Sequence, residues 1–210
     1  MERVKGWEWV VCSNCRMKTI RAKYCMKCGK ELVPTMKSEY VYHFDAVLIG
    51  EEGVGKSTLL EKLATTNQAI KLPSTDGNFP ISFPLQGIEL VVTFTESSSI
   101  ISKTGNEVTS AAVLFDLTNR PTFIKSIRLM RMIDFSKTRP ILYLVGNKLD
   151  LRRERKVSYE EALKTSSEFN SAYFEVSALT GEGVNIFQKR LIRDLLTRRL
   201  EQIRGLAHDG

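Results

Sequence analysis

Apolar positions along most of the chain alternate between the two periods that strands and helices produce. Short apolar runs typical of strands lie at 44–49, 79–85, 88–94, 111–115, 141–145 and 173–176. Segments with helical spacing lie at 56–67, 121–133, 158–169 and 183–204. This alternation predicts an α/β fold with a six-stranded, mostly parallel sheet, helices on both faces and one antiparallel edge hairpin formed by the second and third runs. In such sheets, ligands bind at the carboxyl ends of the strands.

A phosphate-binding motif directly follows the first strand. Residues 50–57 read GEEGVGKS, which fits G-x-x-x-x-G-K-[ST] between a strand and a helix. Its backbone N–H groups can surround a phosphate, Lys56 can reach the outer phosphates, and the Ser57 hydroxyl can hold magnesium. A plain glycine-rich turn is the alternative, and the Lys, the Ser and the flanking elements argue against it. The residues expected at the phosphates are Glu52, Gly53, Val54, Gly55, Lys56, Ser57 and Thr58.

A second motif, GNKLD, follows the strand 141–145. The carboxylate of Asp150 can accept from both the ring N–H and the amine of guanine, a pair of donors that adenine does not offer. The stem of Lys148 can lie along the base, and Asn147 can tie this loop to the phosphate loop. After the last strand, a backbone N–H could donate to the base carbonyl from the loop formed by Ser177, Ala178 and Leu179.

With these motifs in this order, the chain resembles the Rab branch of the Ras-like small GTPases over about residues 44–200. The segments that carry the resemblance are GEEGVGKST, VLFDLTNRPTF, LVGNKLDL and FEVSALTGEGV. The resemblance implies a P-loop NTPase G domain that binds GTP or GDP with Mg²⁺ and has two loops that change shape with the third phosphate. Thr75 looks like the family threonine that reaches the magnesium and the outer phosphate; an ordinary loop threonine is the alternative.

The chain departs from the family after its third strand, where family members carry D-x-x-G-Q. Residues 93–110 contain no Asp and no Gln, and their only glycine is Gly105. The nearest replacements are Thr95, Ser98 and Ser99, whose hydroxyls are uncharged. A carboxylate for the magnesium could come instead from Glu96, Asp76 or Asp116, and the sequence does not choose among them. We therefore assign no catalytic residue beyond the candidate Thr75, expect very slow GTP hydrolysis, and leave open whether the protein is an enzyme.

The four cysteines form two C-x-x-C pairs separated by nine residues. These are Cys12, Cys15, Cys25 and Cys28. Four thiolates at this spacing can surround one tetrahedral Zn²⁺ and leave no open position for water, which indicates a structural site. The segment resembles a zinc ribbon or a rubredoxin-type knuckle. Two disulfides, or iron in place of zinc, are the alternatives.

Charge is concentrated around this cysteine group. Residues 1–38 contain nine Lys and Arg against three Glu, whereas the rest of the chain is nearly balanced. An acidic partner surface or a nucleic acid would suit such a segment, and a solvated lysine-rich face suits it equally well. We divide the chain into a zinc-ribbon-like domain at 1–33, a linker at 34–40, a small GTPase domain at 41–204 and a tail at 205–210.

The chain shows no signal for a membrane. No run approaches the roughly 18 apolar residues of a spanning helix, the start lacks a secretory signal, and no cysteine after Cys28 could carry a lipid. We expect a cytoplasmic monomer whose effectors and regulators the sequence does not identify. The function expected is a Rab-like molecular switch with very slow hydrolysis. The alternatives are a non-hydrolysing interaction module with permanently bound GTP or GDP, and a nucleic-acid-associated protein that uses the basic zinc ribbon.

Overall fold

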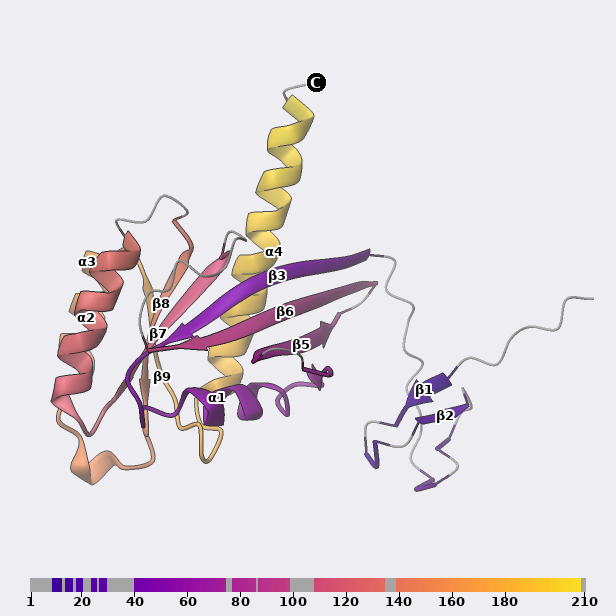
Figure 1. The fold of residues 1–210 in the computed structure, drawn as a ribbon, viewed down its shortest axis with the longest axis horizontal. Helices are drawn as coiled ribbons and strands as arrows, with labels where there is room; N and C mark the ends of the chain where they lie inside the picture. Colours follow the sequence, from indigo (N-terminus) through magenta and orange to yellow (C-terminus); the bar gives the residue numbers. More distant parts are fainter. Residues whose placement is uncertain are drawn as a thin grey trace, which may run out of the picture.

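The chain forms a large mixed sheet flanked by helices and, before it, a small two-stranded sheet (Figure 1). The computed structural model describes residues 9–12, 14–16, 18–20, 24–25, 27–29, 40–74, 77–85, 87–98, 108–134 and 139–208. The strands are β1 (Trp9–Val11), β2 (Lys18–Ile20), β3 (Tyr40–Ile49), β4 (Ile70–Lys71), β5 (Asn78–Pro84), β6 (Ile88–Ser97), β7 (Ser110–Asp116), β8 (Ile141–Asn147) and β9 (Ala172–Glu175). The helices are α1 (Lys56–Leu63), α2 (Arg120–Asp134), η1 (Arg152–Glu154), α3 (Tyr159–Glu168) and α4 (Val184–His208).

The large sheet has the strand order β4-β5-β6-β3-β7-β8-β9. All pairs from β6 to β9 are parallel, and β5 pairs antiparallel with both β6 and β4. The predicted mostly parallel sheet with one edge hairpin is therefore confirmed. The structure adds the two-residue strand β4, which is too short to produce a periodic pattern. Because β3, β6, β7, β8 and β9 are parallel, their carboxyl ends lie at the same end of the sheet. The segments that follow these five strands therefore leave the sheet there.

Two apolar clusters lie on opposite faces of this sheet. One joins the sheet to α1 and α4 and contains fully buried side chains such as Leu60 and Phe187. The other joins it to α2 and α3 and contains Phe115, Phe123 and Ala162. Figure 1 shows α2 and α3 together on one side of the sheet, with α1 and α4 on the other. Burial on both faces explains why β7 and β8 are almost continuously apolar.

The ends of several elements differ from the predicted ones. α1 ends at Leu63 and not at 67, because the Gln188 side chain donates to the carbonyl oxygens of Leu63 and Thr66 and so satisfies the end of the helix. α4 continues to His208, into the predicted tail. Among the described residues, no helix is long and apolar enough to cross a membrane.

Candidate functional site

The phosphate loop lies between β3 and α1, as the motif predicts. Gly53 and Gly55 both have positive φ, and a Cβ on Gly55 would lie 2.3 Å from Nδ2 of Asn147. Glycine is therefore required at this position for both its backbone angle and its lack of a side chain. Nζ of Lys56 donates to the carbonyl oxygens of Gly50 and Glu51, each at 2.8 Å. The Lys56 ammonium is thus held against the loop, and no side chain caps the N-terminus of α1.

Asn147 joins the phosphate loop to the loop after β9. Its Nδ2 donates to the carbonyl oxygen of Val54 at 2.8 Å, and its Oδ1 accepts from the N–H of Ala178 at 2.9 Å. The side chain is buried at the carboxyl end of β8. The predicted link between the two motifs is present in the structure. The same contact uses the Ala178 N–H, one of the donors expected for the base.

The other two residues of the second motif have charged or polar partners. Oδ1 of Asp150 accepts from the hydroxyl of Ser177 at 2.5 Å, so the loop after β9 orients this carboxylate. Nζ of Lys148 lies 2.7 Å from Oδ2 of Asp116, whose Oδ1 accepts from the N–H and the hydroxyl of Thr118. Burial raises the pKa of Asp116, but the hydrogen bonds from Lys148 and Thr118 outweigh this and leave the pKa below its ordinary value. Asp116 therefore remains a carboxylate that positions Lys148.

The sequence analysis did not identify a charged pair that joins the segment after η1 to β9. Arg155 donates to both carboxylate oxygens of Glu175, each at 2.7 Å, and the hydroxyl of Tyr173 donates to Oε1 of Glu175 at 2.7 Å. Burial raises the pKa of Glu175, but the bonds from Arg155 and Tyr173 lower it further than burial raises it. The sequence did contain a sign of this pair, because Glu175 is the one charged residue within the apolar run YFEV. A charged side chain in a buried strand requires a partner.

The structure brings Glu96 to the phosphate loop. Oγ of Ser57 donates to Oε2 of Glu96 at 2.8 Å. The other nearby candidates lie elsewhere: Thr95 donates to the side chain of Asn78, and Asp116 is paired with Lys148. Asp76 and Ser99 lie outside the described residues, as does Thr75. Of the described carboxylates proposed from the sequence, Glu96 is thus the one in contact with Ser57.

The remaining predicted residues lie at the rim of the site. Glu52 and Thr58 are exposed, and Leu179 is 72% exposed. Glu51, which was not among the predicted site residues, forms an ion pair with Lys125 of α2. The negative charge of Glu51, at the start of the phosphate loop, is therefore partly neutralised by Lys125 of α2.

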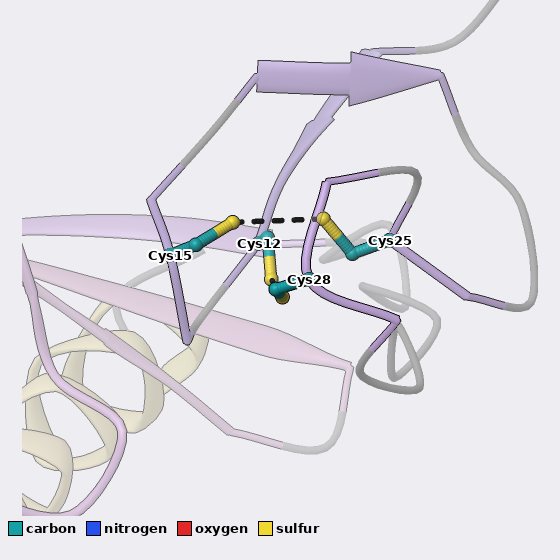
Figure 2. Close-up of side chains that lie close together, drawn as sticks. All are labelled: Cys12, Cys15, Cys25 and Cys28. Carbon is teal, nitrogen blue, oxygen red and sulfur yellow. Dashed lines mark hydrogen bonds between the residues drawn. The ribbon is translucent and has the colours of Figure 1, made fainter.

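The four cysteines gather beside the small sheet β1–β2 (Figure 2). All four Sγ atoms lie within 4.8 Å of one another, with Cys12 and Cys28 at 3.5 Å and Cys15 and Cys25 at 3.6 Å. Four sulfurs bound to zinc at about 2.3 Å would lie about 3.8 Å apart, whereas a disulfide requires about 2.05 Å. None of these four cysteines forms a disulfide, so the structure favours a metal site over the disulfide alternative.

Equivalent turns hold the two cysteine pairs. The N–H of Arg16 donates to the carbonyl oxygen of Cys12, and the N–H of Gly29 donates to that of Cys25, each at 2.8 Å. Both donors have positive φ, which Gly29 adopts without strain. Hydrogen bonds from the backbone N–H groups of Cys28 and Lys27 lower the pKa of the Cys25 thiol, and thiolates are the form that binds metal. The residues present therefore fit one four-coordinate zinc ion.

Comparison with known proteins places this arrangement in a family. The Ras family model matches residues 92–197. The Ras-related protein RABC2b of Arabidopsis thaliana is 31% identical over 159 residues, which cover 71% of this chain and 78% of that protein. The Ras-related protein Rab11B of Nicotiana tabacum is 30% identical over 162 residues, covering 71% and 72%. The Ras-related protein Rab2BV of Beta vulgaris is 32% identical over 161 residues, covering 70% and 72%.

Proposed function

The chain belongs to the Ras family of small GTPases, with relatives among the Rab proteins, and we propose that it is a guanine-nucleotide-dependent molecular switch that hydrolyses GTP very slowly. The observation that carries this proposal is the double contact of Asn147, with Val54 on one side and Ala178 on the other. It joins the loop proposed to bind the phosphates to the two loops proposed to read the base. A glycine-rich turn without a ligand has no need of such a link.

The polar groups at the carboxyl ends of the strands are those expected to bind guanine. The carboxylate of Asp150 is oriented by Ser177, and the ring N–H and amine of guanine are the donors it would accept. Lys56 and the uncapped N-terminus of α1 would receive the phosphates. The magnesium of the nucleotide would be held by the Ser57 hydroxyl, and Thr75 remains a predicted second ligand.

Binding can be tested by calorimetric titration of nucleotide-free protein with GDP, GTP and ATP. We expect both guanine nucleotides to bind and ATP not to, with Lys56→Ala as the variant that loses binding and Lys164→Ala, an exposed lysine of α3, as its matched control. Equal affinity for ATP would contradict the proposed base specificity. The nucleotide that copurifies with the protein gives a second, independent reading.

Slow hydrolysis follows from the missing motif after β6. Family members are slow without a partner's arginine, at about 10⁻³ turnovers per second or less, and the loss of one oriented group costs on the order of a hundredfold. We therefore expect a single-turnover rate below about 10⁻⁵ per second for bound GTP. A rate at or above the family value would contradict this part of the proposal. Exchange of bound GDP for added GTP when EDTA removes magnesium would favour a switch, and failure to exchange it under that condition would favour a permanently loaded interaction module.

The cysteine group is proposed to hold one structural zinc ion. We propose that it folds as a separate zinc-ribbon domain at 1–33, joined by the linker 34–40 to the nucleotide-binding domain at 41–204. The support for a structural role is that four thiolates fill a tetrahedral site completely. So small a sheet has little core, and metal binding of roughly 10 to 16 kcal/mol would supply its folding free energy.

A further inference from the structure

Ser57 and Glu96 come from neighbouring strands whose register fixes their contact. β3 and β6 pair in parallel, with Leu48 opposite Glu96, and the N–H of Gly50 donates to the carbonyl oxygen of Ser97. The phosphate loop then returns the chain so that Ser57, at the first turn of α1, faces the end of β6. Their side chains meet at 2.8 Å between Oγ and Oε2.

We infer that Glu96 is a carboxylate ligand of the nucleotide-bound magnesium, in the place that an aspartate takes in family members with D-x-x-G-Q. The inference rests on the proposed guanine-nucleotide binding. Magnesium holds oxygen ligands at about 2.1 Å in an octahedron, so two adjacent ligands lie about 3 Å apart. The separation of Oγ and Oε2 matches that edge. The Ser57 hydroxyl donates its hydrogen to Glu96, and both oxygens could turn their lone pairs to a cation that binds beside them.

Three other carboxylates in the described part of this site already have partners. Asp116 is buried and has both oxygens used by Thr118 and Lys148. Asp150 accepts from Ser177, and Glu51 is paired with Lys125. Among the described residues, no lysine or arginine forms an ion pair with Glu96, so a divalent cation would meet its full negative charge. Lys56, the nearest cation in the motif, is directed to main-chain carbonyl oxygens.

The replacement also explains how the chain can keep a magnesium-dependent site without the family aspartate. A glutamate has one more methylene than an aspartate, and it can therefore reach the first shell of the metal where an aspartate at the family position acts through the second shell. Hydroxyls at Thr95 or Ser98 could not supply the negative charge. The chain has thus lost the groups that orient water but has retained the charge that holds the metal.

The experiment compares the rate of GDP release in excess Mg²⁺ with the rate in excess EDTA, for the wild type and for Glu96→Gln. In the wild type, magnesium should slow release. In Glu96→Gln, the slowing should shrink by about tenfold or more, the usual cost of removing a carboxylate that supports a metal, while the rate in EDTA stays at the wild-type value. Glu89→Gln removes the same charge from the other end of β6 and should leave both rates unchanged.

Titration of the GDP complex with Mn²⁺, followed by electron paramagnetic resonance, gives a readout of the metal itself. The affinity for Mn²⁺ should fall in Glu96→Gln and not in Glu89→Gln. If Glu96→Gln does not retain GDP in EDTA, Glu96→Ala supplies the same comparison without an amide beside Ser57. Unchanged magnesium dependence and unchanged Mn²⁺ affinity would overturn the inference and leave nucleotide binding standing. A wild type that binds no guanine nucleotide in either condition would overturn the proposed function first, and this inference with it.

Discussion

The side-chain amide of Asn147 donates to the main-chain carbonyl of Val54 across 2.8 Å, which fastens the end of β8 to the phosphate loop. Gly55 leaves the room for this contact, because any Cβ there would collide with the same amide. The other end of the Asn147 side chain holds Ala178. One buried side chain therefore sets the spacing between the groups proposed to bind the phosphates and those proposed to bind the base.

Asn147→Ala should weaken both the fold and nucleotide binding. The change leaves a buried carbonyl and a buried N–H without partners, and each such loss costs about 1 to 3 kcal/mol. We expect the free energy of unfolding, measured by urea denaturation, to fall by about 2 kcal/mol or more, and the affinity for GDP to fall at least tenfold. Asn185→Ala, at an exposed position of α4, is the control. An unchanged GDP affinity would show that Asn147 does not organise the site.

Asp150→Asn should reverse the preference for the base. Hydrogen bonds to a charged group contribute roughly 1.5 to 3 kcal/mol, so the affinity for GDP should fall by about tenfold to a hundredfold. Xanthosine diphosphate offers a carbonyl oxygen in place of the guanine amine and should gain affinity from the new amide donor. Calorimetric titration with both nucleotides measures the change, and Glu154→Gln, an exposed position nearby, should alter neither. A GDP affinity that does not fall would contradict the assignment.

Cys25→Ser should remove the metal and leave nucleotide binding intact. Cys25 is almost fully buried within the sulfur cluster, and three remaining thiolates cannot complete the tetrahedral site. Elemental analysis should find one zinc per chain in the wild type and far less in the variant, while GDP affinity stays the same. Lys27→Ala, exposed between the two cysteines of this pair, should keep its zinc. A wild type without metal, or with two intact disulfides in freshly prepared cell extract, would remove the zinc proposal.

Ser99→Ala should change hydrolysis little. Ser99 lies outside the described residues, and it stands in the sequence where family members carry the glutamine that orients water. A family-like residue at this place would lose much of its rate on truncation, whereas a site that never oriented water from here should be insensitive. The measurement is single-turnover hydrolysis of preloaded GTP. A tenfold or greater decrease at constant GTP affinity would make Ser99 a working catalytic residue.

The parts of the site that lie within one short segment could be predicted from the spacing of residues in the sequence. The phosphate loop needs particular residues at consecutive positions, and so do the motif containing Asn147 and Asp150 and the two cysteine pairs. The alternation of apolar runs was enough to predict the order of strands and helices, because parallel strands buried on both faces leave continuous apolar segments.

Contacts between distant segments could not be predicted in this way. Glu96 meets Ser57 only because of the exact pairing of β3 with β6, and a shift of one residue would turn the carboxylate to the opposite face. Arg155 and Glu175 are twenty residues apart in the sequence and meet through the packing of a loop on β9. Propensity likewise could not predict that α1 ends at Leu63, since that end depends on Gln188 from α4.

The ion pair between Arg155 and Glu175 should make the free energy of unfolding depend on pH. The folded-state pKa of Glu175 is lowered, so its contribution is present above the unfolded-state pKa of about 4.3 and is lost as the pH falls through the lower folded-state pKa. Asp116, whose pKa is also lowered, contributes in the same pH range. A variant of Glu175 is therefore needed to separate the two.

Glu175→Gln should lower the free energy of unfolding at pH 7 and should matter less as the pH decreases. At pH 7 the change removes a charged acceptor from two Arg155 bonds and one Tyr173 bond in a half-buried setting, a loss of about 1 to 3 kcal/mol. As the pH falls below the unfolded-state pKa of about 4.3 and through the lower folded-state pKa, the wild-type carboxyl takes up a proton, and the difference between the two proteins should narrow. Urea denaturation from pH 7 to pH 3 at fixed nucleotide concentration measures that difference. Glu154→Gln should show none, and a gap between wild type and Glu175→Gln that stays constant with pH would mean that the pair stabilises the fold by packing and not by charge.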